Sequence, residues 1–331
     1  MTTLLSYLHN CCSYFKSKVN NDNRSDENDT FQNTIFPKNK FSKSDKYKIL
    51  PIIKINFDDM CLKEALGEGG TAVVYRYNDG KMNFACKKLT RNIVSLEREI
   101  DIMKTYNTHK NLPTYYDSFI NHNTSLDVSL RNHYIFMEYC EGKELFDMIK
   151  HNFDYKLATS IIYQLLLAVK HLQKYNIIHS DIKLENIIID SKNQIKLIDF
   201  GLSRKIEKGN AVLLNRYIGT IGYIAPESIL LNYVTLKTDI WSIGILYYIL
   251  LNNNHMFNVL NIDSYKKQLN QLNYIINKTN GITINNSTIT NSNHYVNIVS
   301  FLIKTICYER HRFNVKECLK SPIFKNKMVN V

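Results

Sequence analysis

Apolar residues in the first half of the chain occur mainly in short, strand-like runs. Two of these runs, 72–77 and 81–89, flank the turn-forming residues Asn78, Asp79 and Gly80. Runs rich in β-branched and aromatic residues predict strands, and the turn between them predicts a hairpin. Helical spacing interrupts the pattern at Ile93, Leu96, Ile100 and Met103. We therefore expect a β-rich region that carries one main helix.

The spacing of apolar residues becomes helical beyond Gly142. Residues 239–251 are apolar nearly all round, and an earlier helix is indicated by Ile161, Leu165, Val169 and Leu172. The apolar run of about twelve residues is typical of a buried helix, because a membrane-spanning helix needs roughly 20. These patterns predict an α+β fold with two lobes: a β-rich lobe at about 52–139 and a larger, mainly α lobe at about 142–325.

Polar, asparagine-rich segments precede and interrupt these lobes. Residues 19–45 hold few aliphatic side chains and cannot bury enough surface to offset the entropy of ordering. We expect residues 1–51 to form a flexible extension before a single domain at 52–325. Residues 252–297 are rich in Asn, Thr and Ser, which predicts an irregular insert. We interpret the excess of asparagine as a compositional bias that carries little function.

Composition and charge narrow the functional classes. A net charge of +12 would suit an anionic partner, but the lysines are scattered and form no dense basic block interleaved with aromatic residues. We therefore expect no direct binding to nucleic acid. The seven cysteines form no C-x-x-C pair, which indicates a reducing compartment. The sequence indicates neither a secretory signal nor a transmembrane segment, so we expect an intracellular protein, either cytoplasmic or nuclear. If a virus encodes it, that location is in the host cell. We expect a monomer.

Candidate metal ligands lie at the ends of a second predicted hairpin. Residues 187–190 and 195–198 are strand-like runs that a polar segment separates. Antiparallel pairing of these runs would return Asp199 to the side of Asn186. Two hard oxygen ligands would then meet at one end of the hairpin, as a Mg²⁺ ion on nucleotide phosphates requires.

A candidate base precedes this hairpin. Asp181 lies five residues before Asn186, so a short loop can hold it near the metal while leaving it able to accept a proton. Lys183 would point the same way and can neutralise charge on a phosphoryl group in transit. We interpret His179 as a buried ring that braces the loop.

Glycines and a lysine upstream suit phosphate binding. The segment 66–74 places Gly67, Gly69 and Gly70 between two predicted strands, where backbone amides can approach phosphates. Lys87 follows among apolar neighbours, where its charge needs an anionic partner. Either Glu97 or Glu99 of the predicted helix could pair with it. Periodicity does not choose between these two, and we favour Glu99.

The order and spacing of these motifs resemble the eukaryotic protein kinase superfamily, over residues 57–324. The resemblance implies a two-lobed kinase fold that uses ATP and Mg²⁺, with Mn²⁺ as the alternative ion. Its implied metal ligands are Asn186 and Asp199, and its implied catalytic residues are Asp181, Lys183, Lys87 and Glu99. The residues implied for nucleotide binding are Leu66, Gly67, Glu68, Gly69, Gly70, Thr71, Ala72, Val74, Ala85, Lys87, Met137, Glu138, Cys140 and Glu144.

The same resemblance implies which residues hold the catalytic loop and the activation segment. By likeness to the family, Asp239 anchors the loop that carries Asp181. Glu227 closes the segment Ala225-Pro226-Glu227 and pairs with Arg312.

Lys183 and the Gly219-Thr220-x-x-Tyr223 segment match the branch of the family that phosphorylates serine and threonine in proteins. Three alternatives stay open at this point: a tyrosine or dual-specificity kinase, a pseudokinase that acts as a scaffold, and a small-molecule kinase of the choline or aminoglycoside type. A pseudokinase commonly lacks one of the residues Lys87, Asp181, Asn186 and Asp199, all of which this chain retains.

Two departures from the family pattern bear on regulation. The catalytic loop reads His179-Ser180-Asp181, whereas many regulated kinases have an arginine before the aspartate to grip a phosphorylated activation loop. Between Arg204 and Gly219 there is no Ser or Thr, and Tyr217 is the only hydroxyl. We hypothesise an activation segment that is competent without phosphorylation.

Two acidic residues bear on the choice of protein substrate. Glu144 and Glu185 match positions that contact arginines upstream of the target hydroxyl in basophilic kinases. A preference for upstream basic residues is one interpretation, and ordinary ribose or solvent contacts are the other. The physiological substrate, the pathway and the organism are not encoded in these patterns.

Overall fold

The computed structural model describes residues 61–68, 72–89, 93–106, 108–120, 133–149, 153–207, 211–257, 259–272 and 282–325. The predicted extension 1–51 and the loop residues Gly69, Gly70 and Thr71 lie outside these ranges. Contacts divide the chain into two units. Unit 1 comprises Met1–Ile93 and Tyr115–Tyr139, and unit 2 comprises Val94–Thr114 and Cys140–Val331.

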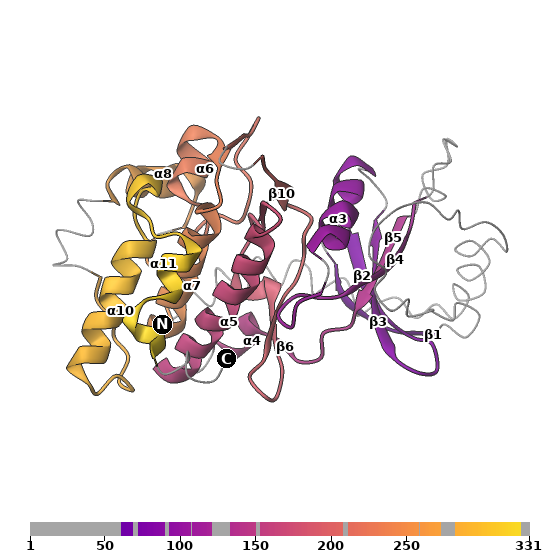
Figure 1. Cartoon of the computed structure of the whole chain (residues 1–331), viewed down its shortest axis with the longest axis horizontal. Coiled ribbons are helices and arrows are strands. Elements are labelled where there is room, and N and C mark those ends of the chain that lie inside the picture. The colour runs from indigo at the N-terminus through magenta and orange to yellow at the C-terminus, as the bar shows by residue number, and fades with distance from the viewer. Residues whose placement is uncertain are drawn as a thin grey trace. The chain divides into compact units, whose positions relative to one another are not determined.

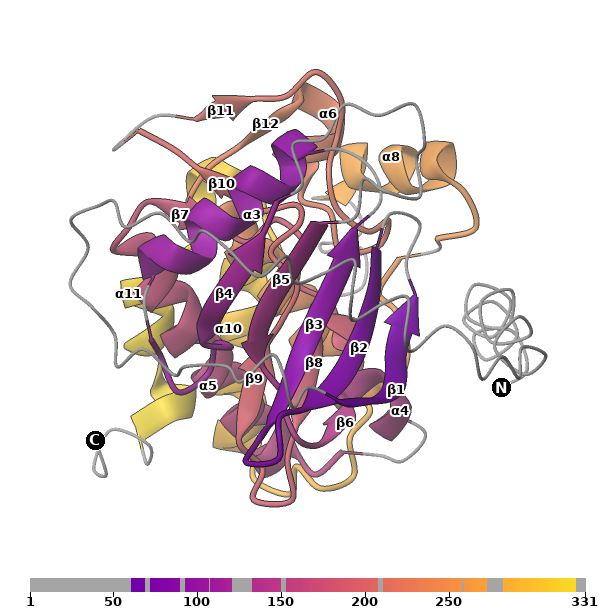
Figure 2. The same cartoon turned by 90° about the vertical axis from the view of Figure 1, so that its right-hand side faces the viewer.

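Unit 1 is built on an antiparallel sheet of five strands, which Figure 2 shows side by side. Their order across the sheet is β1-β2-β3-β5-β4. Their bounds are β1 Cys61–Glu68, β2 Ala72–Asn78, β3 Asn83–Leu89, β4 Tyr115–Phe119 and β5 His133–Glu138. The prediction of a β-rich first lobe is confirmed.

The predicted hairpin is formed by β2 and β3. Asn78 pairs with Asn83, and the Asn78 side-chain amide donates to Asn83 Oδ1 at 2.9 Å. The Asp79 carboxylate accepts from the backbone N–H groups of Lys81 and Met82 at 3.0 and 2.9 Å. Because these bonds hold residues 79–82 in the turn, the second strand begins at Asn83 and not at Lys81 as predicted.

The two faces of this sheet have different roles. One face carries an aromatic core of Tyr77, Cys86, Tyr134 and Phe136. Side chains alternate along a strand, so the residues next to Cys86 point to the other face. Cross-strand pairing gives Lys87 the neighbours Val74 and Ile135 there.

Unit 2 is mainly helical, as predicted (Figure 1). Its helices are α3 Ile93–Tyr106, α4 Leu145–Met148, α5 Tyr155–Gln173, α6 Pro226–Leu231, α7 Thr238–Asn252, α8 Ile262–Asn270, α10 Ser292–Thr305 and α11 Val315–Leu319. The predicted helices at 161–172 and 239–251 are α5 and α7, and both are largely buried. No helix in the described ranges is both long enough and apolar enough to cross a membrane.

The helix α3 differs from expectation in its grouping. The sequence placed it in the β-rich lobe, but all of it except Ile93 belongs by contacts to unit 2. The reason lies at its C-terminal end. Tyr106 is fully buried, and the centre of its ring lies 4.9 Å from that of Phe200. Its carbonyl accepts a hydrogen bond from His171 at 2.6 Å.

Short strands and turns complete unit 2. A three-stranded sheet has the order β6-β8-β9, from Lys143–Glu144, Ile187–Ile189 and Ile195–Leu197. Two strand pairs lie elsewhere: β10 Arg204–Lys205 with β7 Ile177–Ile178, and β11 Val212–Leu213 with β12 Tyr233–Val234. Short 3-10 turns include η3 Leu184–Asn186 and η4 Glu309–His311.

Asparagine has a structural use that the sequence interpretation missed. Asn176, Asn193, Asn232 and Asn253 adopt positive φ, which asparagine tolerates better than most residues. The predicted irregular insert at 252–297 is likewise partly helical. Asn261 and Asn291 cap the N-termini of α8 and α10 by accepting backbone N–H bonds.

Candidate active site

The loop that carries the candidate base is pinned to the buried helix α7. Backbone N–H groups of His179 and Ser180 donate to the two carboxylate oxygens of Asp239 at 2.8 and 2.9 Å. Asp239 is fully buried, and burial raises its pKa, although nearby His179 and these two hydrogen bonds oppose the rise. A carboxylate with both oxygens engaged fixes the backbone just before Asp181, as the resemblance implied.

His179 has the bracing role expected of it. Its ring is buried and meets Phe200 edge-on at 5.1 Å. The Nδ1 atom accepts from the Asp181 backbone N–H at 3.3 Å, so the ring proton belongs on Nε2, which donates to the carbonyl of Ile198 at 3.2 Å. The ring thereby joins the loop of Asp181 to the strand that leads to Asp199.

Asp181 and Lys183 form a triangle with Thr220. The Thr220 hydroxyl donates to Asp181 Oδ1 at 2.7 Å and accepts from Lys183 Nζ at 3.0 Å. Lys183 Nζ also lies 3.4 Å from Asp181 Oδ2. Burial alone would lower the pKa of Lys183, but the negative charges of Asp181 and Glu185 outweigh it and raise that pKa. The lysine is therefore held charged beside the candidate base.

A glycine makes the approach of Thr220 possible. Gly219 has a φ of +106°, which disfavours any residue with a side chain. A Cβ atom there would lie 2.8 Å from the carbonyl oxygen of Ser180. The activation segment can thus pass directly over the catalytic loop only with glycine before Thr220.

The predicted metal ligands lie at one end of a hairpin, as expected from the sequence. Strands β8 and β9 pair antiparallel, and the Ile198 N–H donates to the Asn186 carbonyl at 2.9 Å. The side-chain amide nitrogen of Asn186 donates to the Asp181 carbonyl at 2.8 Å and to its Oδ2 at 3.1 Å. Its amide oxygen therefore faces away from Asp181. An amide oxygen and the exposed carboxylate of Asp199 are the hard donors that Mg²⁺ prefers, so the residues fit the ion.

The activation segment is held by backbone pairing and by apolar packing. Strand β10 pairs with β7 just before the catalytic loop, and β11 pairs with β12 after α6. Val212, Leu214 and Ile218 pack on a buried cluster that includes Ile178 and Val234. Backbone bonds and side-chain packing both fix this segment within unit 2.

A buried ion pair closes the segment. Arg312 binds both carboxylate oxygens of Glu227 at 2.6 and 2.9 Å, and its guanidinium carbon lies 5.3 Å from the centre of the Trp241 ring. Both partners are nearly inaccessible to solvent. The pairing that the resemblance implied is therefore present.

The comparison with known families decides the interpretation of this site. The family profile for the protein kinase domain matches residues 61–324. The chain belongs to the protein kinase family. The resemblance drawn from the motifs and the α+β, two-lobed fold class are thereby confirmed.

Curated relatives of this kinase domain are similar over part of their length. The chain is 34% identical over 225 residues to death-associated protein kinase dapk-1 of Caenorhabditis elegans, covering 61% of this chain and 15% of that protein. It is 36% identical over 171 residues to CDPK-related kinase 5 of Arabidopsis thaliana, covering 50% and 27%. It is 31% identical over 199 residues to serine/threonine-protein kinase PEPKR2 of Arabidopsis thaliana, covering 59% and 40%. The chain therefore spans less than half the length of these relatives.

In unit 1 of the kinase domain, the register supports part of the predicted nucleotide site. Val74, Ala85, Lys87 and Met137 lie on one face of the sheet, because Val74 pairs with Lys87 and Ala85 with Met137. Their role in nucleotide binding stays a prediction. Other predicted members have these places: Leu66, Gly67 and Glu68 on β1, Ala72 on β2, Glu138 on β5, Cys140 after β5 and Glu144 on β6. The predictions for Gly69, Gly70 and Thr71 fall outside the described residues.

The glutamates of α3 differ in burial. Glu99 is 2% exposed, whereas Glu97 is exposed on the helix surface. A buried carboxylate needs a partner, so burial favours Glu99 as the functional residue. Its pairing with Lys87 stays a prediction.

Three residues near the site were missed or undervalued. Thr220 was noted from the sequence only as a family marker, yet it bridges Asp181 and Lys183. Arg98 donates to the Gly201 carbonyl at 3.2 Å, and Arg204 donates to the carbonyls of Leu202 and Ser203 at 3.1 and 2.9 Å. Arg98 was recognisable only as the residue before Glu99, because no periodicity singles out a helix arginine that bonds to a distant loop.

Proposed function

We propose that this chain is a serine/threonine protein kinase that transfers the γ-phosphoryl group of ATP to a hydroxyl of a protein. The observation that carries the proposal is the bridge from Thr220 to both Asp181 and Lys183. Of these residues, Thr220 and Lys183 are the ones that the resemblance links to the serine/threonine branch. The relative PEPKR2, which is named a serine/threonine-protein kinase, supports the same assignment.

In the proposed reaction, the substrate hydroxyl oxygen forms a bond to the γ-phosphorus. The bond from that phosphorus to the bridging oxygen of ADP breaks, and ADP leaves. Asp181 orients the hydroxyl and accepts its proton. Lys183 neutralises charge on the transferred group, and Thr220 keeps this lysine and Asp181 in register. Asn186 and Asp199 would hold Mg²⁺, which when bound supplies positive charge to the phosphate oxygens.

Phosphate transfer from radiolabelled ATP to a generic basic protein tests the proposal, followed by analysis of the phosphorylated amino acids. We expect phosphoserine or phosphothreonine. Asp181→Asn should lose at least about a hundredfold in rate, since a general base contributes about 10²–10⁴-fold. Asp263→Asn, an equally conservative change at an exposed position on α8, is the matched control. Equal transfer by wild type and Asp181→Asn, or labelling confined to tyrosine, would refute the proposal.

We further propose that the activation segment is competent without phosphorylation. Ser180 stands where regulated kinases carry the phosphate-gripping arginine, and packing of Val212, Leu214 and Ile218 gives the segment another support. The guanidinium groups of Arg98 and Arg204 bond to backbone carbonyls at the start of the segment. A protein produced together with a phosphatase should therefore be as active as untreated protein. Dependence on an upstream kinase would contradict this.

We also propose that Glu185 recognises a basic residue upstream of the target hydroxyl. Its Oε2 atom is buried and has no hydrogen-bond partner among the described residues. Burial raises the pKa of Glu185, although the charge of Lys183 opposes the rise. A cationic side chain from the substrate would supply the missing partner. Glu144, half-buried on β6, is proposed for the same preference.

A peptide array that varies the residues upstream of the target Ser or Thr tests this preference. Wild type should favour Arg or Lys there, and Glu185→Gln and Glu144→Gln should each weaken that selection. The idea fails if both variants keep the wild-type selection.

A further inference from the structure

Two histidines stack on each other away from the residues of phosphoryl transfer. His109, in the loop between α3 and β4, lies 4.8 Å from His171 of α5, with the ring planes 30° apart. His109 Nδ1 accepts from the Asn111 backbone N–H at 3.2 Å, so its proton lies on Nε2. His171 Nε2 donates to the Tyr106 carbonyl at 2.6 Å. Both rings thus have a fixed tautomer and orientation.

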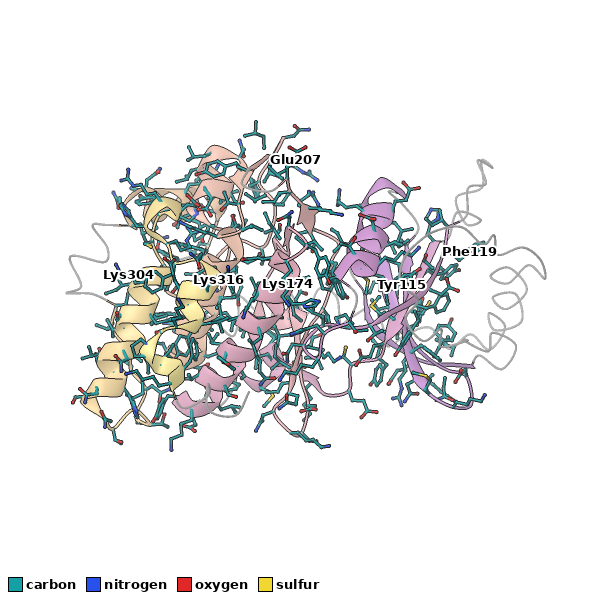
Figure 3. All side chains as sticks on the ribbon, viewed as in Figure 1. Tyr115, Phe119, Lys174, Glu207, Lys304 and Lys316 are labelled. Atoms are coloured by element: carbon teal, nitrogen blue, oxygen red, sulfur yellow. The ribbon has the colours of Figure 1, made fainter. Side chains whose placement is uncertain are left out.

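Three lysines surround this pair. Lys110 follows His109 in the loop, Lys174 is the C-cap of α5, and Lys196 lies on β9. Burial, then neighbouring His171 and the charges of all three lysines, lower the pKa of His109 to about 4. Lys110 and Lys174 are exposed, and Lys174 is labelled in Figure 3. Among the described residues, no carboxylate contributes to this shift.

Two of these lysines also have a local structural role. A cation at the C-terminus of α5 complements the helix dipole, which accounts for Lys174. Lys110 and Lys196 come from two other elements. Lys196 is drawn in because it donates to the Leu112 carbonyl at 3.1 Å and because the Leu197 N–H donates to the Asn111 carbonyl at 2.9 Å. Gathering like charges in this way costs free energy, which a bound anion would recover.

We propose that the surface formed by His109, Lys110, His171, Lys174 and Lys196, named here the His109 surface, binds an acidic segment of a protein partner. It presents lysine ammonium groups and the Nε2–H of His109, which are complementary to Asp and Glu side chains. A single-stranded nucleic acid would need ring faces on which bases can stack. One face of His109 and one face of His171 are instead covered by each other, and His171 also contacts Tyr175.

The His109 surface is connected to the candidate active site through packed residues. Tyr106, whose carbonyl binds His171, packs its ring against Phe200, the residue after Asp199. Lys174 lies only five residues before His179 along the chain. An acidic segment docked on the His109 surface would therefore contact residues that lie near the catalytic loop in the sequence. The inference extends the proposed kinase function and rests on it for the choice of a protein as partner.

A fluorescein-labelled peptide of Asp, Glu and Gly, which lacks any Ser, Thr or Tyr and cannot be phosphorylated, tests the inference. Its anisotropy is measured with the full chain and no ATP, against a peptide with Asn and Gln in place of the acids. We expect binding of the acidic peptide only, weakening as salt rises. Lys110→Glu/Lys174→Glu should weaken binding at least about tenfold, because both contacts become repulsive.

The matched control is Lys267→Glu/Lys316→Glu. The control changes the net charge equally, at two exposed lysines that each lie in the last turn of a helix. Equal loss in the two double variants, no binding by wild type, or tighter binding of an oligothymidine through the same lysines would each overturn the inference. Phosphorylation of a short peptide by Lys110→Glu/Lys174→Glu should stay at the wild-type rate. Loss of binding with retained phosphorylation, or the reverse, therefore separates this inference from the proposed function.

Discussion

Removing the Thr220 hydroxyl should slow phosphoryl transfer without unfolding the protein. Valine has the shape of threonine but neither donates nor accepts a hydrogen bond, so Thr220→Val breaks two bonds at once. Asp181 loses a donor at 2.7 Å, and Lys183 loses an acceptor at 3.0 Å. Asp181 would keep the contact with Lys183 at 3.4 Å and the hydrogen bond from the Asn186 amide at 3.1 Å, but the bridge between the two charged groups would be lost.

The size of the effect follows from the charge of the partners. A hydrogen bond to a charged group contributes about 1.5–3 kcal/mol. If the transition state loses that much stabilisation, kcat falls by about 10- to 150-fold, since each 1.36 kcal/mol is a factor of ten. Binding of ATP does not depend on this hydroxyl, so the KM for ATP should stay near its wild-type value.

Steady-state transfer to a peptide substrate measures both constants. Thr220→Ser is the control, because serine keeps the hydroxyl and should stay within about threefold of wild type in kcat. Thermal unfolding of both variants checks that the fold is intact. A Thr220→Val protein with the kcat of wild type would refute the view that this hydroxyl holds Asp181 and Lys183 in register.

Three further predictions concern groups buried around the site. Asp239→Asn leaves one of the two backbone N–H groups without an acceptor. Chemical denaturation should therefore show a free energy of unfolding that is lower by about 1–3 kcal/mol, and a wild-type free energy would contradict the anchoring role. Arg312→Met leaves the Glu227 carboxylate buried without a cation, which should lower the free energy of unfolding by about 3–5 kcal/mol. The double variant Arg312→Met/Glu227→Gln should recover part of that stability. Burial lowers the pKa of His255 from 6.5 to about 4. The unfolded state therefore takes up the proton first, and stability falls between pH 6.5 and 4, by about 2 kcal/mol at pH 5. His255→Leu should flatten the dependence of the free energy of unfolding on pH. An unchanged slope in this variant would argue against His255 as the titrating group.

Much of the site was predictable because its residues are close in sequence or recur at fixed spacing. The β8–β9 hairpin follows from two short apolar runs, and it alone brings Asp199 to the end where Asn186 lies. The helices α5 and α7 follow from apolar periodicity. The pairing of Arg312 with Glu227, 85 residues apart, came only from likeness to the family.

What the sequence could not predict depends on side-chain partners that no spacing reveals. The bridge from Thr220 to Asp181 spans 39 residues and depends on the close passage that Gly219 allows. The stacking of His109 on His171 requires the loop after α3 to fold against α5, and no periodicity records that contact. Asparagine was misinterpreted for a related reason. Its value at caps and at positive φ shows only when helix ends are known.

Contacts of the first residues of α7 support the proposal that the activation segment is competent without phosphorylation. Thr238 donates to the Glu227 carboxylate at 3.1 Å, Asp239 holds the catalytic loop, and Ser242 donates to the Tyr223 carbonyl at 2.9 Å. One turn of a buried helix thus binds the catalytic loop and both ends of the segment that follows Thr220. Because α7 belongs to the core of unit 2, these contacts form when that core folds. A phosphate would then have little left to order, which agrees with Ser180 in place of a phosphate-binding arginine.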